Sequence, residues 1–231
     1  MTDIAILKYF VPIYQITIWP VCRLLLFIFG NLKVSGIENL KDIQSGVILA
    51  ANHTTAMDPV IIRTAMPFWG YHKATYAVSL TKENYDTFWG RLLYGGWFFK
   101  IIGAWPAFRK TGDYKKSFKY HIYLLNNKKA VIIFPEGGRN KLSKPMDKKP
   151  KPGLIHLSLL TNTPIIPISI KGQAGLNPLS FFLRKHRMSV HFHQPIKPED
   201  LKEKYPDLKA EEKSDGSIRA VKEIMDNIYK I

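Results

Sequence analysis

Beyond Gly30, short apolar runs alternate with amphipathic segments along the chain. Runs of this length are typical of buried strands, and the amphipathic stretches between them are typical of helices that cover a sheet. Strands are expected at 47–51, 74–78, 130–134, 165–170 and 188–193. Helices are expected at 113–127, 153–160 and 217–229. The alternation predicts an α/β fold, with a single mixed sheet flanked by helices over residues 31–231.

Two of these patterns carry further detail. The apolar positions of 217–229 recur at helical spacing, so this segment is expected to close the core rather than bind a partner. The strand at 165–170 has a proline just before its start, Pro164, and another in its middle, Pro167. Because proline cannot donate to a ladder, these residues predict an irregular or edge strand.

The first 30 residues have a different pattern. Residues 4–29 are mostly apolar and aromatic, and polar or helix-breaking residues interrupt them at Lys8, Pro12, Gln15, Pro20 and Arg23. A membrane span needs about 20 predominantly apolar residues. We therefore expect two short helices, broken near the prolines, that lie in the membrane interface or re-enter it. A true span and a helix folded onto the domain are the alternatives. The candidate membrane-anchoring residues are Phe10, Tyr14, Trp19 and Arg23.

Charge adds a class of partner. Lys and Arg number 34 against 18 Asp and Glu, a formal net charge of +16, which favours anionic partners such as a lipid surface, nucleic acid or acidic substrates. The basic residues are dispersed and accompany no nucleic-acid-binding motif, so no nucleic acid is expected. The single cysteine, Cys22, excludes an intrachain disulfide and, within an apolar segment, is expected to be inert.

Two basic segments interrupt the domain pattern. Residues 140–152 carry five lysines, three prolines and one acid, which predicts an exposed loop: either a docking surface for anionic lipid or an acidic acyl carrier, or a solvated loop. Residues 181–187, FFLRKHR, join two phenylalanines to a basic cluster. That combination suits a headgroup interface, and a hairpin tip with partly buried phenylalanines is the alternative.

The candidate chemistry begins at His53, which follows the expected strand 47–51. Asp58 reads as a helix N-cap and Pro59 as the first helical residue, so His53 lies on a loop at the carboxyl end of a strand. A histidine oriented by a carboxylate can remove a proton from a hydroxyl near neutral pH. The alternative is an ordinary loop histidine beside a capping aspartate.

Basic and glycine-rich blocks follow other expected strands. Residues 103–110 end in Arg109 and Lys110, and residues 130–140 run from a strand into Glu136, Gly137, Gly138 and Arg139. Glycines let backbone amides approach an anion, and arginine binds phosphate through two parallel hydrogen bonds. Glu136 is expected to hold an arginine or to bind a substrate hydroxyl. His191 and His193 share a strand face, but no third ligand accompanies them, so no metal site is expected.

Together these blocks resemble the 1-acyl-glycerol-3-phosphate acyltransferase family, over about residues 34–195. The N-H-x-x-x-x-D block is met by Asn52, His53 and Asp58, and the Gly-to-Arg block by Gly103 and Arg109. The F-P-E-G-T-R block is met by Phe134, Pro135, Glu136, Gly137 and Arg139, and the P-I-x-P strand by Pro164, Ile165 and Pro167. The chain departs from the family where Thr55 replaces the common serine and Gly138 the usual threonine.

The resemblance implies transfer of a fatty acyl group from a thioester, acyl-CoA or acyl-carrier protein, to the sn-2 hydroxyl of 1-acyl-glycerol-3-phosphate, forming phosphatidic acid. It implies direct attack, with His53 as general base and Asp58 behind it, and an acceptor phosphate bound by Arg109, Arg139 and Lys110. No further cofactor is expected. The chain is expected on the cytoplasmic face of the cell membrane, peripheral or monotopic, against anionic lipid. The alternatives are another lysophospholipid or amino-acid lipid acceptor, or a non-catalytic lipid-binding protein of the same fold.

Overall fold

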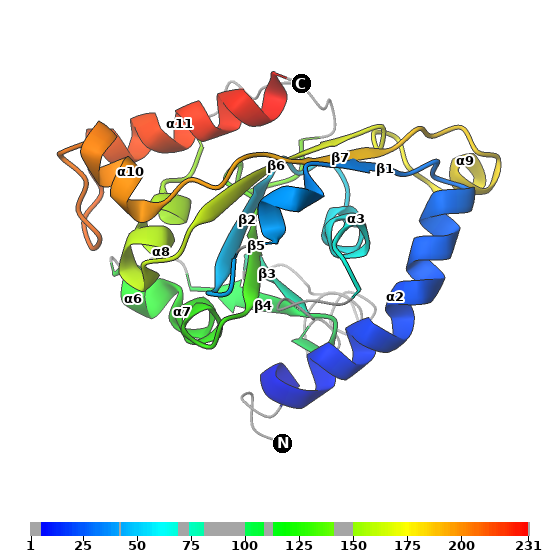
Figure 1. Ribbon diagram of the computed structural model, residues 1–231, viewed down its shortest axis with the longest axis horizontal. Helices are drawn as coiled ribbons and strands as arrows, with labels where there is room; N and C mark the ends of the chain where they lie inside the picture. The colour runs from blue at the N-terminus through cyan, green and yellow to red at the C-terminus, as the bar shows by residue number, and fades with distance from the viewer. Residues whose placement is uncertain are drawn as a thin grey trace, which may run out of the picture.

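A single sheet organises the part of the chain that the computed structural model describes, residues 6–41, 43–68, 74–80, 100–108, 113–140 and 150–230. Its order is β1-β7-β6-β2-β5-β3-β4 (Figure 1). The strands are β1 (Lys33–Ser35), β2 (Val47–Ala51), β3 (Thr75–Leu80), β4 (Ala104–Ala107), β5 (Ala130–Ile133), β6 (Ile165–Lys171) and β7 (Ser189–Phe192). β6 and β7 pair antiparallel, whereas the other neighbours are parallel, so the predicted mixed α/β sheet is confirmed.

Helices cover both faces of this sheet (Figure 1). The helices of the described residues are η1 (Ile6–Phe10), α2 (Val11–Ile28), η2 (Ile37–Leu40), α3 (Asp58–Ala65), α6 (Tyr114–Ser117), α7 (Lys119–Asn126), α8 (Gly153–Thr161), α9 (Pro178–Phe182), α10 (Pro198–Lys204) and α11 (Asp215–Tyr229). One apolar core joins the sheet to α7, α8 and α11, and a second joins its other face to α3 and the end of α2. As predicted, α11 closes the first of these cores.

The segment expected as one helix at 113–127 is interrupted. The Asp113 side chain accepts hydrogen bonds from the amides of Lys115 and Lys116 and begins α6, but Phe118 (φ −109°, ψ 22°) separates α6 from α7. The apolar stripe is kept across this break, since Phe118, Leu124 and Leu125 are all buried. Side-chain spacing therefore indicated the buried face but not the change in backbone at Phe118.

Of the two alternatives for residues 165–170, an irregular or an edge strand, the edge position is wrong. β6 lies inside the sheet, between β2 and β7. Pro167 falls between the isolated bridge Ile165↔Ile196 and the first ladder pair with β7, Ile168↔Phe192. At this gap its carbonyl accepts a hydrogen bond from the His193 amide, and the missing N–H interrupts no ladder pair.

The N-terminal segment is one continuous helix rather than two broken ones. η1 runs directly into α2, and Pro20 lies inside α2 on an exposed position, where a freed carbonyl can be hydrated. Within the described residues, Lys8–Ile28 is the one helix long and apolar enough to cross a membrane. The same helix also packs against the domain through Gln15, Trp19 and Arg23.

Those three side chains reach the strand and helix nearest to them. Gln15 is buried and pairs with Thr75, donating from Nε2 to its carbonyl (2.7 Å) and accepting from its amide (2.8 Å). The Trp19 indole donates to the Arg63 carbonyl at 3.2 Å, and the Arg23 guanidinium donates to the Thr64 carbonyl at 2.7 Å. The polar residues that interrupt the apolar pattern thus attach the helix to the domain.

Candidate active site

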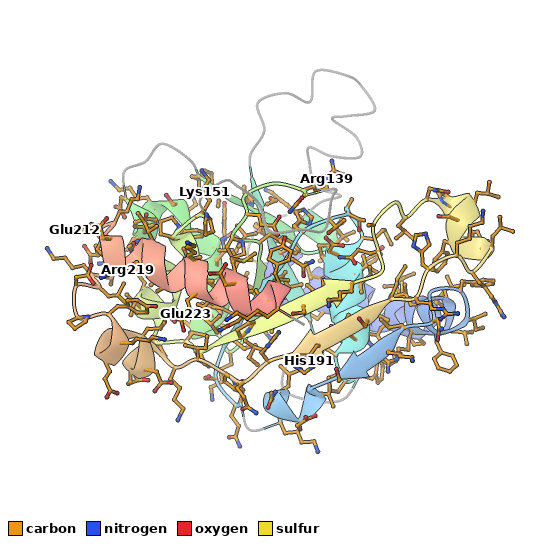
Figure 2. All side chains as sticks on the ribbon, turned by 90° about the horizontal axis from the view of Figure 1, so that it is seen from above. Arg139, Lys151, His191, Glu212, Arg219 and Glu223 are labelled. Atoms are coloured by element: carbon orange, nitrogen blue, oxygen red, sulfur yellow. The ribbon has the colours of Figure 1, made fainter. Side chains whose placement is uncertain are left out.

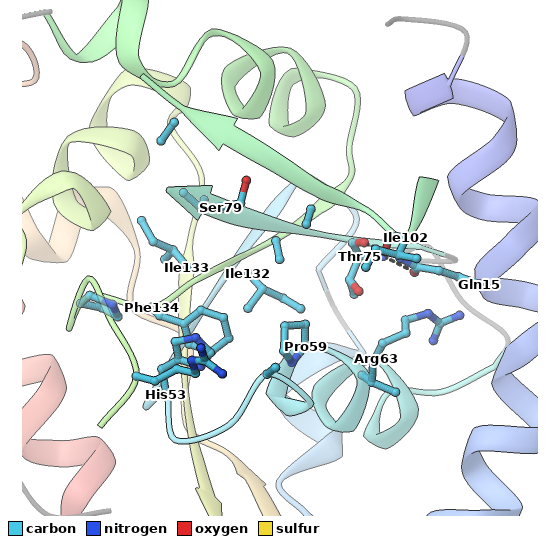
Figure 3. A pocket seen from close by; sticks show the side chains of 18 of the residues that line it. Gln15, His53, Pro59, Arg63, Thr75, Ser79, Ile102, Ile132, Ile133 and Phe134 are labelled. Carbon is cyan, nitrogen blue, oxygen red and sulfur yellow. Dashed lines mark hydrogen bonds between the residues drawn. The ribbon is translucent and has the colours of Figure 1, made fainter. Parts of the chain in front are cut away.

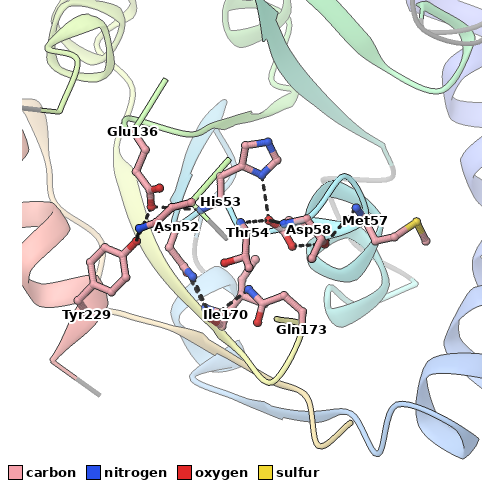
Figure 4. A network of polar contacts seen from close by, with 11 residues as sticks. Asn52, His53, Thr54, Met57, Asp58, Glu136, Ile170, Gln173 and Tyr229 are labelled. Carbon is pink, nitrogen blue, oxygen red and sulfur yellow. Dashed lines mark hydrogen bonds and ion pairs between the residues drawn. The ribbon is translucent and has the colours of Figure 1, made fainter. Parts of the chain in front are cut away.

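His53 and Asp58 are brought together on the loop between β2 and α3. The His53 Nδ1 lies 2.9 Å from Asp58 Oδ2 (Figure 4). The Asp58 side chain is fully buried, whereas 18% of the His53 side chain is exposed. An ionised carboxylate only accepts hydrogen bonds, so Nδ1 carries the proton and Nε2 presents a lone pair. This is the geometry required of a general base oriented by a carboxylate.

Backbone amides of the same loop hold the Asp58 carboxylate. Its Oδ2 accepts from the amides of Thr54 (2.6 Å) and Thr55 (3.0 Å), and its Oδ1 from the Thr55 hydroxyl (2.8 Å). Asp58 is the first residue of α3, with Met57 at the N-cap, which corrects the predicted cap assignment by one residue. Its carboxylate therefore orders the loop before the helix. The Thr55 hydroxyl contributes one of these hydrogen bonds, and the serine expected at this position would carry the same donor.

The β5–α8 loop supports His53 from the other side. The Phe134 ring stacks on the imidazole with centroids 4.0 Å apart, and the Asn140 amide donates to the His53 carbonyl at 2.6 Å. Glu136 Oε1 accepts from the His53 amide at 3.2 Å. β2 and β5 are parallel neighbours, so their carboxyl ends place both loops at one edge of the sheet.

Glu136 belongs to this network and forms no ion pair with Arg139 in the described part of the chain. Its Oε1 also accepts from the Tyr229 hydroxyl of α11 at 2.6 Å (Figure 4). Burial raises the pKa of the Glu136 carboxyl, while the hydrogen bonds from Tyr229 and His53 lower it. Its Oε2 is buried without a hydrogen-bond partner among the described atoms.

Sequence reasoning missed two residues at this site. Tyr229 lies 93 positions from Glu136, and no local pattern connects them. Lys151 lines the same cavity as His53 and packs against Gly137, whose φ of +68° turns the chain there. Its signal was present in the basic segment 140–152. Residues 141–149 of that segment lie outside the described residues.

Positive side chains lie at the mouth of the site. Arg139 and Lys151 are exposed and line the cavity along the same edge of the molecule, whereas His191 lies at the opposite edge (Figure 2). Gly138 also lines it, and among the described residues no atom lies within 4 Å of where a Cβ would be. Arg109 and Lys110, predicted as further phosphate ligands, lie outside the described residues.

The cavity extends from His53 to the N-terminal helix (Figure 3). Its volume is about 500 Å³, within the range of roughly 300–1,000 Å³ typical of ligand pockets. One end carries His53, Arg139 and Lys151, and the other is walled by α2 and α3. The α2 side chains that line it are Tyr14, Gln15, Ile18, Trp19 and Cys22. Arg63 of α3 lines it too, and burial lowers the pKa of its guanidinium to about 10.

The predicted anchoring residues separate into two groups. Phe10 and Tyr14 are 42% and 37% exposed, so they are available to a membrane. Trp19 and Arg23 instead contact α3, as described above. Cys22 is half-buried, and burial raises the pKa of its thiol, which keeps the sulfur protonated.

His191 and His193 each have a local partner. The His191 Nδ1 lies 2.8 Å from the Ser35 hydroxyl, and the His193 Nε2 lies 2.8 Å from the Ser169 hydroxyl. Burial and the neighbouring His191 lower the pKa of His193. The residues that the structure describes contain no group of three His, Cys, Asp or Glu side chains able to hold a metal.

Known proteins share these features. The chain is 26% identical over 183 residues to a 1-acyl-sn-glycerol-3-phosphate acyltransferase of Streptococcus pneumoniae, covering 79% of this chain and 62% of that protein. It is 25% identical over 184 residues to the enzyme of that name from Cocos nucifera, covering 78% of this chain and 55% of that one. The chain thus spans about 55–62% of the length of these relatives.

A solved structure shares the fold. The crystal structure of the 1-acyl-sn-glycerophosphate (LPA) acyltransferase PlsC from Thermotoga maritima superposes with a TM-score of 0.61 at 19% identity, covering 95% of this chain and 78% of that one. A family model described as Acyltransferase matches residues 31–171, which include His53, Asp58 and the Glu136–Arg139 turn. The chain belongs to the Acyltransferase family.

Proposed function

We propose that the chain transfers a fatty acyl group from a thioester to the free hydroxyl of 1-acyl-glycerol-3-phosphate, forming phosphatidic acid. The observation that carries this proposal is the placement of His53, backed by buried Asp58, in one cavity with the cations Arg139 and Lys151. A base beside an anion site suits an acceptor that carries both a hydroxyl and a phosphate. The two curated relatives bear the name of this activity.

The transfer proceeds in two steps. The His53 Nε2 takes the hydroxyl proton as the acceptor oxygen attacks the thioester carbonyl carbon, so that a C–O bond forms and the carbonyl oxygen becomes negative. Asp58 stabilises the imidazolium and fixes its orientation. The intermediate then collapses, the C–S bond breaks, and the imidazolium returns the proton to the departing sulfur. A positioned general base contributes about 10²- to 10⁴-fold to such a reaction.

The negative oxygen of the intermediate needs a donor. The amides of Thr54 and Thr55 donate to Asp58, and the Gly137 amide donates to the Phe134 carbonyl, so these three are occupied. We assign the role to the amide of Gly138, which lines the cavity on the turn beside His53. Direct transfer is favoured over an acyl-enzyme, because the Cys22 thiol on the cavity wall has a pKa raised by burial and is a poor nucleophile.

The lining assigns the two ends of the cavity to different parts of the substrates. Phosphate would bind at Arg139 and Lys151, which line the cavity beside His53. Glu136 is not among the lining residues, so its expected contact with a substrate hydroxyl stays a prediction. An acyl chain would extend towards α2, past Ile132, Val60 and Ile18. Arg109 and Lys110 remain predicted phosphate ligands. Gly138, which lacks the side chain of the usual threonine and has no described atom within 4 Å of a Cβ position, favours a second candidate within the same reaction: an acceptor with a larger headgroup than the usual one.

Thioester release tests the proposal. The protein is assayed with 1-acyl-glycerol-3-phosphate, other lysophospholipids and a lyso amino-acid lipid, each with acyl-CoA and with acyl-carrier protein as donor. Thioester release that requires 1-acyl-glycerol-3-phosphate supports the proposal. Faster release with another lysolipid would identify that lysolipid as the acceptor instead. His53→Ala and Asp58→Asn should lower kcat by at least about 10²-fold in protein with an unchanged circular dichroism spectrum. Full activity of folded His53→Ala protein excludes the mechanism.

Membrane association is part of the same proposal. Its basis is the apolar N-terminal helix, whose polar side chains attach one face to the domain and whose other face is exposed. A helix held in this way would lie in the interface plane, on the cytoplasmic face of the membrane, rather than cross the bilayer.

A further inference from the structure

The chain between β6 and β7 is longer than the sheet requires. Their antiparallel ladder ends at the pair Lys171↔Ser189, and a hairpin loop of about two to five residues would join strands at that point. Instead, residues 172–188 leave the sheet and carry α9. Most of this excursion is therefore not needed to connect the two strands.

This excursion has a defined shape. The buried His186 contacts the Gly172 carbonyl through Nδ1 (2.9 Å) and the Ser180 hydroxyl through Nε2 (2.8 Å). Gly172 has a φ of +81°, and a side chain there would collide with the carbonyl of Arg187. The base of the excursion is therefore closed, and α9 is held at a fixed place relative to the sheet.

α9 contacts the C-terminal end of the N-terminal helix (Figure 1). The two elements are far apart in the sequence. The Phe29 ring lies 5.8 Å from that of Phe181 and 5.2 Å from that of Phe182, measured between centroids. The Arg184 guanidinium lies 5.8 Å from the Phe29 centroid. These contacts make the exposed sides of the two elements neighbours.

Exposed apolar side chains are concentrated on these two elements. Of the large apolar residues exposed in the described part of the chain, nine lie in the N-terminal helix, three lie at 179–183, and two, Met57 and Tyr123, lie elsewhere. The most exposed are Leu179 (70%) and Phe27 (69%). The full set on the two elements is Tyr9, Phe10, Ile13, Tyr14, Ile18, Val21, Leu24, Phe27, Ile28, Leu179, Phe182 and Leu183. A concentration of this kind marks an interaction surface.

The charge beside this surface is of one sign. Residues 4–37 and 172–198 contain no Asp or Glu, whereas Arg184, Lys185 and Arg187 are exposed next to the apolar side chains. A second copy of the chain would bring the same positive charge to the contact and be repelled. An anionic bilayer satisfies both features, because its core accepts the apolar side chains and its headgroups pair with the basic ones.

We propose that the exposed face of the N-terminal helix and residues 179–187 form one docking surface for an anionic phospholipid bilayer, with α9 as a second membrane contact. Two contacts fix the orientation of the domain, which one helix lying in the interface would leave free to rotate about its axis. Tyr14 and Ile18 lie both on this surface and in the cavity wall, so the orientation brings the cavity to the bilayer. The purpose of this orientation, though not the surface itself, rests on the proposed function.

The test uses the full chain and vesicles of phosphatidylcholine with or without phosphatidylglycerol. Phe182→Ser with Leu183→Ser should lower partitioning onto the mixed vesicles about tenfold or more, because two exposed apolar side chains no longer enter the bilayer. The matched variant Phe182→Leu with Leu183→Met keeps the apolar surface and should partition normally.

The charge is tested with a second matched pair. Arg184→Glu with Lys185→Glu should weaken binding to the mixed vesicles roughly 30-fold and binding to phosphatidylcholine alone much less. Lys202→Glu with Lys222→Glu makes the same change in net charge on exposed positions at the far side of the molecule and should have little effect. If the two glutamate double variants lose vesicle binding equally, net charge alone attracts the protein to the membrane, and the proposal is overturned.

Two other results decide against the surface. The proposal is overturned if the serine double variant (residues 182 and 183) and the glutamate double variant (residues 184 and 185) both partition onto vesicles like the wild type. A dimer would also overturn it if the substitutions at residues 182–185 dissociate that dimer in analytical ultracentrifugation while vesicle binding persists. The surface would then bind a second copy of the chain. Thioester release with detergent-dispersed lysolipid should be unchanged in every α9 variant. That assay separates failure of docking from failure of the proposed acyl transfer.

Discussion

Tyr229→Phe removes one hydroxyl from the support of the candidate base. The Tyr229 hydroxyl donates to the Glu136 Oε1 at 2.6 Å, and that same oxygen accepts from the His53 amide. A hydrogen bond to a charged group contributes about 1.5–3 kcal/mol to stability. For a chain of this size the loss corresponds to a fall in Tm of about 3–12 °C. Because the His53 loop loses part of its support, kcat should fall about tenfold with KM little changed.

The loss of stability should depend on pH. Burial raises the folded-state pKa of Glu136 and the Tyr229 hydroxyl lowers it, so the substitution raises this pKa further. For a carboxyl with a raised folded pKa, its stabilising contribution is present below the unfolded pKa and is lost as pH rises through the folded pKa. The variant should therefore be most destabilised at neutral pH. The difference should shrink as pH falls through the raised folded-state pKa of Glu136, because the unfolded glutamate titrates identically in the two proteins and only their folded states differ.

Chemical denaturation at several pH values and thioester release measure the two effects. Tyr205→Phe is the matched control, because its hydroxyl also donates to a glutamate at 2.6 Å, but to the partly exposed Glu223. That variant should change the free energy of unfolding by less than about 0.5 kcal/mol and leave kcat unchanged. If Tyr229→Phe behaves like Tyr205→Phe in both assays, the hydroxyl does not support the site.

Four further substitutions test single positions. Asn52→Ala removes a buried amide that binds both backbone groups of Ile170 (2.9 and 2.8 Å), so it should cost about 2–3 kcal/mol in urea unfolding. Gly138→Thr should leave stability unchanged, because no described atom lies within 4 Å of a Cβ there, and it should narrow the range of lysolipids accepted in the release assay. Gly137→Ala, at φ +68°, should cost about 1–2 kcal/mol. Gln15→Leu should free the N-terminal helix from the domain and increase its cleavage in limited proteolysis.

Contrary results are defined for the substitutions at Asn52, Gly138 and Gln15. A Tm for Asn52→Ala within 1 °C or so of the wild-type value would mean that Ile170 finds other partners. A large loss of stability in Gly138→Thr would mean that the turn is more crowded than the described residues indicate. Protection of the helix in Gln15→Leu would assign its attachment to Trp19 and Arg23 alone.

Prolines show where local pattern misled. Pro20 and Pro167 predicted a broken helix and an irregular or edge strand, because proline removes a donor and constrains its neighbours. Both elements continue. Pro20 is on the exposed side of α2, and Pro167 falls where β7 leaves the ladder, so the missing donor is not needed at either place. Whether a backbone N–H is needed depends on the neighbouring strand or on solvent, and neither is encoded nearby.

The sequence by itself predicted five of the seven strands that the structure describes, the order of the blocks and the His53–Asp58 pair, because these depend on short runs of neighbouring residues or on the alternation of apolar and polar positions. It did not indicate β1 or β4. The sequence also indicated the acyltransferase family, through the motif residues that follow the predicted strands. Only the tertiary structure decided that Tyr229 supports Glu136, that Trp19 and Arg23 face the domain, and that α9 lies beside Phe29. These contacts join segments separated by 41 to more than 150 positions. Such pairs are set by how the sheet and its helices pack, a property of the whole chain that no local pattern carries.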